Sequence, residues 1–166
     1  MTLITGGQRS GKSTFALNLC EEKSDSLLLI ATCEPKDAEL KQRVEFHKKE
    51  RDERWKLVEE SLHISKVNFS EDIILIDCVT LWLSNIFFNF DESVEESMKF
   101  AKNEIDHISF QQKNITWVTN EIGLGVIPES ELSRKFCDLQ GWINQFLAEK
   151  CTEVYFMISG ISQKIK

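Results

Sequence analysis

The sequence predicts an α/β fold in which helices flank a central, mainly parallel sheet. Short apolar runs, such as LLLIAT at residues 27–32 and IILI at residues 73–76, alternate with longer helical patterns. These runs lack the polar alternation of a strand with one wet face, so they predict a sheet that is buried on both faces. Strands separated by helices pair in parallel through right-handed crossovers. Ligands are therefore expected at the carboxyl ends of the strands.

The first half of the chain supplies three predicted strands. An apolar run at residues 3–5 ends in two glycines and is followed by a helical pattern at residues 12–22. The run at residues 27–32 is the second strand, and a long charged helix is predicted at residues 36–54. The run at residues 73–76 is the third.

The second half continues the alternation. Helical material fills most of residues 78–112, and ITWVT at residues 115–119 is the next strand. A helix is predicted at residues 129–150, with Ser130 as its candidate N-cap. VYFMIS at residues 154–159 is the last predicted strand.

Composition places the chain among ordinary globular proteins. Its 166 residues are most simply one domain, spanning residues 1–166, with 42% apolar and 28% charged residues. A net charge of −7 argues against a general nucleic-acid binder. No apolar run approaches the roughly 20 residues of a membrane helix, and no removable signal peptide is expected. The five cysteines lack metal-site spacing, which favours reduced thiols in a cytoplasmic protein.

The first polar stretch carries the strongest motif. Gly6 and the sequence Gly11-Lys12-Ser13 fit the G-x4-G-K-[ST] phosphate loop, with a strand before and a helix after. In such a loop the backbone N–H groups face phosphate oxygens. Lys12 would reach the β and γ phosphates, and the hydroxyl of Ser13 would bind Mg²⁺. The alternative is a glycine-rich turn without a ligand. The strand and helix on either side favour the phosphate loop.

Asp77 ends the apolar run that begins at residue 73. A carboxylate at a strand's carboxyl end can hold Mg²⁺ or its water ligands. The alternative is that Asp77 caps the helix that follows. Position alone leaves the two open.

His47 lies in the charged helical stretch. Arg43 and Arg51 are each one helical turn from it, and Lys48 is adjacent. Nearby cations favour a neutral imidazole, whose free nitrogen could attack phosphorus, and they could also stabilise phosphates. The alternative is a solvated helix face of mixed charge, which spacing alone favours.

The stretch TNEIGLGVIPES, residues 119–130, follows a predicted strand and contains two glycines, a proline and acidic residues. A loop at that end of a strand is a place for substrate contacts. The alternative is a plain connection to the next helix.

Several of these segments, in this order, resemble one enzyme family. The chain is similar to the bifunctional adenosylcobinamide kinase/adenosylcobinamide-phosphate guanylyltransferases of cobalamin assembly. The matching stretches are TGGQRSGKS, IAT at residues 30–32, RVEFHKKERDERW at residues 43–55, IDCVTLWLSN at residues 76–85, VTNEIGLGVIP at residues 118–128 and GWINQFLAEKCTEVYFMISG at residues 141–160. They extend over almost the whole chain.

The resemblance implies a RecA-like phosphate-loop fold, assembled as a cytoplasmic homotrimer without nucleic acid or membrane insertion. It implies that adenosylcobinamide is phosphorylated with ATP or GTP, and that GMP from GTP is then transferred through His47, giving adenosylcobinamide-GDP. Mg²⁺ would be held by Ser13 and Asp77, and Lys12 and His47 would be catalytic. The implied nucleotide contacts are Gly6, Gly7, Gln8, Arg9, Ser10, Gly11, Lys12, Ser13, Ala31, Thr32, Cys33, Lys48, Lys49, Glu50, Arg51, Glu59 and Asp77.

The chain departs from the family pattern at three positions. Some relatives carry glutamate where this chain has Asp77, Cys137 stands where an arginine is expected, and Asp52 stands where a proline is usual.

Two other functions fit the phosphate loop. A plain small-molecule kinase would need no nucleophilic histidine. A nucleotide-gated assembly module would transfer nothing to a corrinoid.

Overall fold

The computed structural model describes residues 1–33, 53–112 and 114–166. Strands and helices alternate along most of this length, as the sequence predicts. The elements are β1 (Thr2–Gly6), α1 (Lys12–Glu21), β2 (Leu27–Ala31), β3 (Trp55–Glu59), the short 3-10 helix η1 (Ile64–Lys66), β4 (Ile73–Asp77), α3 (Val79–Asn89), α4 (Val94–Gln111), β5 (Ile115–Val118), α5 (Glu131–Lys150), β6 (Glu153–Ile158) and β7 (Ile161–Lys164).

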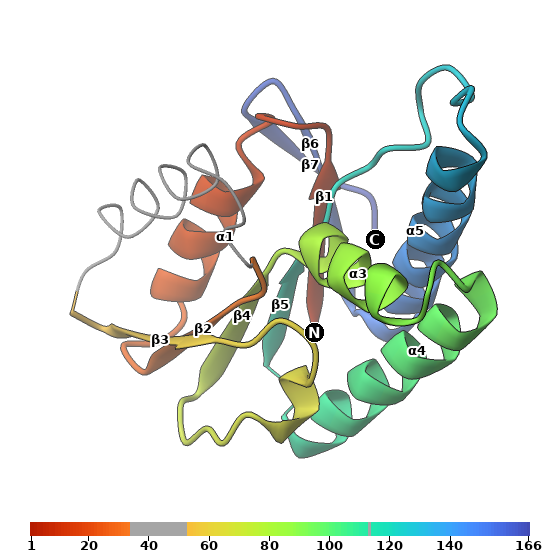
Figure 1. Ribbon diagram of the computed structural model, residues 1–166. Helices are drawn as coiled ribbons and strands as arrows, with labels where there is room; N and C mark the ends of the chain where they lie inside the picture. The colour runs from red at the N-terminus through yellow and green to blue at the C-terminus, as the bar shows by residue number, and fades with distance from the viewer. Residues whose placement is uncertain (34–52, 113) are drawn as a thin grey trace.

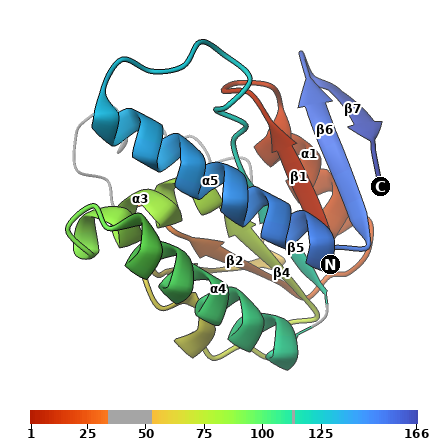
Figure 2. The same ribbon diagram turned by 90° about the vertical axis from the view of Figure 1, so that its right-hand side faces the viewer.

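The described strands form one sheet in the order β3-β2-β4-β5-β1-β6-β7. Each neighbouring pair runs parallel except β6 and β7, which form an antiparallel hairpin at one edge. The predicted α/β fold with a mainly parallel sheet is therefore confirmed. In Figure 1, α1 covers one face of the sheet, while α3, α4 and α5 cover the other. Figure 2 shows α5 lying across the strands, with β7 at the outer edge.

Both faces of the central strands are buried, which explains their unbroken apolar sequences. In β2, Leu28 and Ile30 pack into the core beneath α3, α4 and α5, while Leu27 and Leu29 pack toward α1. This follows from the two-residue period of a strand. Each aliphatic side chain buried in this way contributes about 1.5–3 kcal/mol.

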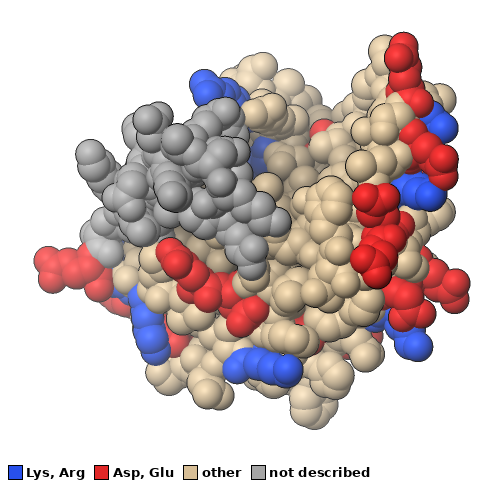
Figure 3. All heavy atoms as spheres, viewed as in Figure 1, with Lys and Arg blue, Asp and Glu red and all other residues tan. Residues whose placement is uncertain are grey.

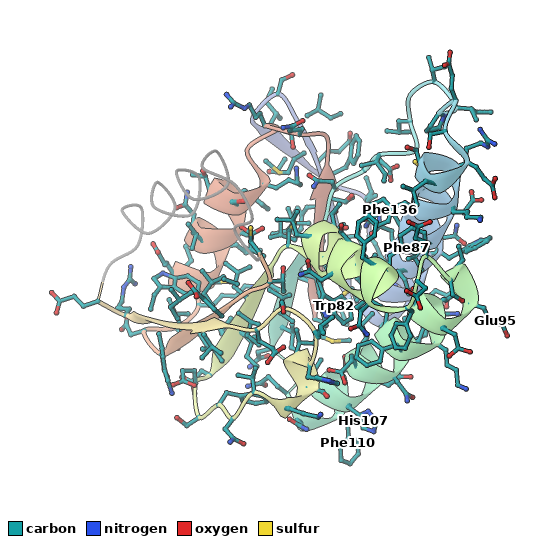
Figure 4. All side chains as sticks on the ribbon, in the orientation of Figure 1. Trp82, Phe87, Glu95, His107, Phe110 and Phe136 are labelled. Atoms are coloured by element: carbon teal, nitrogen blue, oxygen red, sulfur yellow. The ribbon has the colours of Figure 1, made fainter. Side chains whose placement is uncertain are left out.

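Aromatic side chains hold the three-helix face together. Trp82 and Phe87 of α3 are fully buried. The Phe87 ring lies 5.8 Å, centroid to centroid, from that of Phe136 on α5. The side chains of Trp82, Phe87 and Phe136 are labelled between the helices in Figure 4. This packing fixes α3, and with it the chain that leaves the end of β4.

Two strands were not predicted from the sequence, β3 and β7. β3 mixes polar and apolar residues and, among the described strands, pairs only with β2, and β7 is exposed along its length. Edge strands of this kind are defined by the partner strand rather than by an apolar run. The helical material of residues 78–112 forms two helices, and the hydroxyl of Ser93 caps the second by accepting from the Glu96 N–H. The helix predicted at residues 36–54 lies almost entirely outside the described residues.

Candidate nucleotide site

The turn after β1 has a backbone that requires glycine at both motif positions. Gly6 has φ of 152° and Gly11 has φ of 91°. A Cβ on Gly6 would lie 2.5 Å from the carbonyl oxygen of Met157 and 2.9 Å from the Ser10 hydroxyl oxygen, closer than packing allows. On Gly11 a side chain would approach Gly160 and require an unfavourable left-handed conformation. The spacing of the two glycines thus matches the tight loop that the motif predicts.

The first turn of α1 is open to an anion. Its N-cap is Gly11, no side chain among the described residues caps its N–H groups, and no acidic residue occupies its first turn. By contrast, α3, α4 and α5 begin with side-chain caps from Cys78, Ser93 and Ser130. Uncapped N–H groups and the positive end of the helix dipole together favour a phosphate. The predicted N-cap at Ser130 is also confirmed.

The side chain of Lys12 is buried within the loop. Its Nζ donates to the Gly7 carbonyl oxygen at 2.6 Å and contacts the Ser10 hydroxyl oxygen at 3.5 Å. Burial lowers the pKa of Lys12, while Cys78 and Asp77 act in the opposite direction through their charge. A phosphate oxygen is a stronger acceptor than a carbonyl oxygen for an ammonium group. The geometry therefore suits a lysine that binds phosphate.

Asp77 ends β4 and is not the N-cap residue of the following helix. The cap of α3 is Cys78, whose Sγ accepts from the Leu81 N–H at 3.5 Å. Burial, with a further contribution from Asp77, raises the pKa of the Cys78 thiol to about 12. The N-cap position of α3 therefore belongs to Cys78 and not to Asp77. Its carboxylate lies close enough to Lys12 to influence the pKa of that lysine.

The ends of β2 and β3 meet the end of β4 at the same edge of the sheet. Ala31 is opposite Asp77 on one side and Glu59 on the other. The buried hydroxyl of Thr32 donates to the Cys78 carbonyl oxygen at 2.8 Å. The Asn85 amide donates to the Thr32 carbonyl oxygen at 2.9 Å. These bonds fix the β2 end beside the β4 end.

The remaining predicted site residues are not part of the loop, and several of them lie outside the described residues. Cys33, which follows Thr32, is half-buried, and the side chain of Glu59 is exposed. The predicted nucleophile His47 lies outside the described residues, as do its neighbours Arg43, Lys48, Lys49, Glu50, Arg51 and Asp52. Their roles remain predictions.

Two further segments contact the loop, one in the predicted substrate loop at residues 119–130 and one in a turn that the sequence did not assign to the site. The Gly160 N–H, in the turn between β6 and β7, donates to the Ser10 carbonyl oxygen at 3.0 Å. The Glu121 N–H, after β5, donates to the Gly6 carbonyl oxygen at 3.0 Å. No local motif marks either contact. The positive φ at Ser159 and Gly160 shows a tight turn that Gly160 alone suggests in the sequence.

The tight loop, the uncapped start of α1 and the buried lysine form a candidate phosphate-binding site. Comparison with known proteins shows the family of the chain. The sequence profile of the family described as "Cobinamide kinase / cobinamide phosphate guanyltransferase" matches residues 2–165. The chain belongs to this family. It is therefore an enzyme of the kinase and guanyltransferase type, as the resemblance implied.

Curated relatives of this kinase/guanyltransferase match along almost their whole length. The "Bifunctional adenosylcobalamin biosynthesis protein CobU" of Escherichia coli strain K12 is 38% identical over 181 aligned residues, covering 100% of this chain and 99% of the relative. The "Bifunctional adenosylcobalamin biosynthesis protein CobP" of Pseudomonas aeruginosa is 36% identical, covering 99% and 96%. In the described part of the chain, no helix has the length and apolar character to cross a membrane.

Proposed function

We propose that this enzyme acts in cobalamin biosynthesis by catalysing two successive reactions on adenosylcobinamide. It first phosphorylates the substrate hydroxyl with ATP or GTP, and it then transfers GMP from GTP to that phosphate through a histidine–GMP intermediate. The product is adenosylcobinamide-GDP. The observation that carries the proposal is the loop around the buried Lys12, in a chain that matches a kinase/guanyltransferase family over residues 2–165.

In the kinase reaction, the substrate hydroxyl oxygen attacks the γ-phosphorus of the nucleotide. The bond from that phosphorus to the bridging oxygen breaks, the nucleoside diphosphate leaves and the hydroxyl proton passes to solvent. Lys12 and the first N–H groups of α1 would offset charge on the phosphate oxygens. Both belong to the turn between β1 and α1, where Lys12 would exchange its bond to the Gly7 carbonyl oxygen for one to a phosphate oxygen.

In the guanylyl transfer, an imidazole nitrogen of His47 attacks the α-phosphorus of GTP and pyrophosphate leaves. The phosphate oxygen of adenosylcobinamide phosphate then attacks the same phosphorus, and the phosphorus–nitrogen bond breaks to restore the histidine. The cations at Arg43, Lys48 and Arg51 would stabilise the phosphates. This assignment rests on the match of RVEFHKKERDERW to the family.

Mg²⁺ fits the oxygen donors that the site offers. Ser13 opens α1 and Asp77 ends β4. Mg²⁺ is held by one or two protein oxygens together with phosphates and water. Among the described residues, no three His, Cys, Asp or Glu side chains form a metal cluster. When bound, it would neutralise charge on the transferring phosphates.

The proposal extends to the remaining nucleotide contacts and to the domain organisation, location and oligomeric state of the protein. Thr32, Cys33 and Glu59 follow or end the strands beside Asp77, where a nucleotide bound to the loop would extend. We propose one domain over residues 1–166 and a cytoplasmic homotrimer.

One experiment separates this function from a plain kinase. The protein is incubated with GTP, Mg²⁺ and adenosylcobinamide, and the masses of both protein and corrinoid are measured. The expected result is a GMP adduct on the protein and adenosylcobinamide-GDP as product. A phosphorylated corrinoid with no protein adduct would identify a kinase alone. An unchanged corrinoid would contradict the proposal.

A further inference from the structure

The loop after β5 presents an unusual group of side chains to solvent. We name residues 119–130 the apolar loop. The exposed fractions of Leu124, Val126 and Ile127 are 76%, 96% and 77%, and Ile122 is 37% exposed. Aliphatic side chains this exposed and this close in sequence form a patch of the kind that marks binding surfaces.

The apolar loop is anchored at both ends. At its start, the Thr119 N–H donates to the Ile4 carbonyl oxygen, and the Glu121 N–H donates to the Gly6 carbonyl oxygen, both at 3.0 Å. At its end, the guanidinium of Arg134 on α5 donates to the carbonyl oxygens of Pro128 and Glu129. Only the segment between these anchors projects, and it carries the exposed aliphatic side chains.

The anchors place the start of the apolar loop next to the turn of Gly6 to Ser13, which we name the nucleotide loop. Its first residues follow β5, which lies between β1 and β4, the strands that end in Gly6 and Asp77. In Figure 1 the apolar loop begins at the carboxyl ends of the strands and rises above the start of α5, at the same end of the sheet as the turn that follows β1. A molecule held against it would thus have its edge near the end of a bound triphosphate.

Its composition excludes the nucleotide as the occupant of this surface. Residues 119–130 contain no lysine or arginine and carry two acidic side chains, Glu121 and Glu129. Acidic side chains also predominate along the adjoining right-hand edge of the face in Figure 3. A triphosphate would be repelled here, whereas a cation with a large apolar surface would be attracted.

We infer that the apolar loop is the docking surface for the corrinoid acceptor, a conclusion that rests on the proposed function. Adenosylcobinamide has the required chemistry, because its macrocycle has a methyl-rich periphery and its cobalt(III) centre leaves a net positive charge. Leu124, Val126 and Ile127 bury apolar surface against the macrocycle. Glu121 and Glu129 complement its charge. This arrangement directs the side arm with the reacting hydroxyl toward the nucleotide loop.

The test removes the aliphatic side chains and leaves the anchors intact. In the triple variant Leu124→Ser/Val126→Ser/Ile127→Ser, equilibrium dialysis measures the Kd of adenosylcobinamide without nucleotide. The Kd is expected to rise by at least about tenfold, because the variant loses most of the apolar contact. The Kd of a non-hydrolysable GTP analogue is expected to stay within about twofold, since the fold and the nucleotide loop are unchanged.

The control variant is Phe110→Ser. Phe110 is 85% exposed and lies at the far end of α4, as Figure 4 shows, so its loss changes exposed apolar area without touching the apolar loop. It should leave both Kd values unchanged. An unchanged corrinoid Kd in the triple variant would overturn the inference, as would a change in subunit number by light scattering, which would show that a second copy covers the loop. A parent protein that binds the GTP analogue but no adenosylcobinamide would overturn both this inference and the proposed function.

Discussion

Substituting Asn144 by alanine would test the polar network that supports the base of the apolar loop. The Asn144 side-chain oxygen accepts from the Thr119 hydroxyl at 2.8 Å and from the Gln140 amide at 3.0 Å. Its amide nitrogen donates to the Asn120 carbonyl oxygen at 3.2 Å. Thr119 and Gln140 are almost completely buried, so neither can exchange its lost partner for bulk water.

The expected loss follows from those three bonds. A neutral hydrogen bond contributes about 1 kcal/mol net, and more when its removal leaves a buried group without a partner. Gln140 and Thr119 keep their mutual bond of 2.8 Å, which limits the damage. The higher helix propensity of alanine returns a few tenths of a kcal/mol. The free energy of unfolding should therefore fall by roughly 2–4 kcal/mol, which lowers Tm by about 10 °C for a chain of this size.

Urea unfolding and thermal denaturation measure the loss, with Gln145→Ala as the matched control. Gln145 is the next residue of α5 and is exposed, so its replacement should change stability by less than about 0.5 kcal/mol. Thr119→Val completes a double-mutant cycle, in which the two losses should not add because both variants break the same bond. A change below about 0.5 kcal/mol for Asn144→Ala would refute the reasoning.

The other predictions concern the chemistry. Lys12→Ala should abolish phosphoryl transfer while the circular dichroism spectrum stays the same, and near-normal kinase turnover would contradict its role. Asp77→Asn should weaken Mg²⁺-dependent activity more than nucleotide binding measured in EDTA, whereas an unchanged Mg²⁺ dependence would remove Asp77 from the metal site. His47→Ala should remove both guanylyl transfer and the acid-labile protein–GMP adduct detected with [α-³²P]GTP, but keep some kinase activity. The exposed His107 provides the control variant, and an adduct that persists in His47→Ala would show another nucleophile.

The sequence by itself determined the central strands and the nucleotide loop. β2 and β4 are apolar at every position that faces either core, so their strand character and their burial could be predicted together. The loop was equally predictable, because Gly6 and Gly11 at their fixed spacing serve a local backbone conformation. In both cases, residues close in sequence are sufficient to predict the local structure.

Only the tertiary structure decided which residue is the N-cap of α3, and which strands form the edges of the sheet. Asp77 and Cys78 were equally placed to begin α3, and the bond from Leu81 identifies Cys78 as the cap. The edge strands β3 and β7 are too polar to stand out in the sequence. They are strands because β2 and β6 supply their hydrogen-bond partners.

Contacts between distant parts of the chain also required the structure. Glu121 and Gly160 donate to the loop that follows β1, although more than 100 residues separate them from it. The sequence suggested a substrate loop at residues 119–130, but it could not show that Leu124, Val126 and Ile127 remain exposed. The burial of a side chain depends on which other parts of the chain pack against it. An apolar stretch of sequence therefore does not show whether its side chains lie in the core or face solvent.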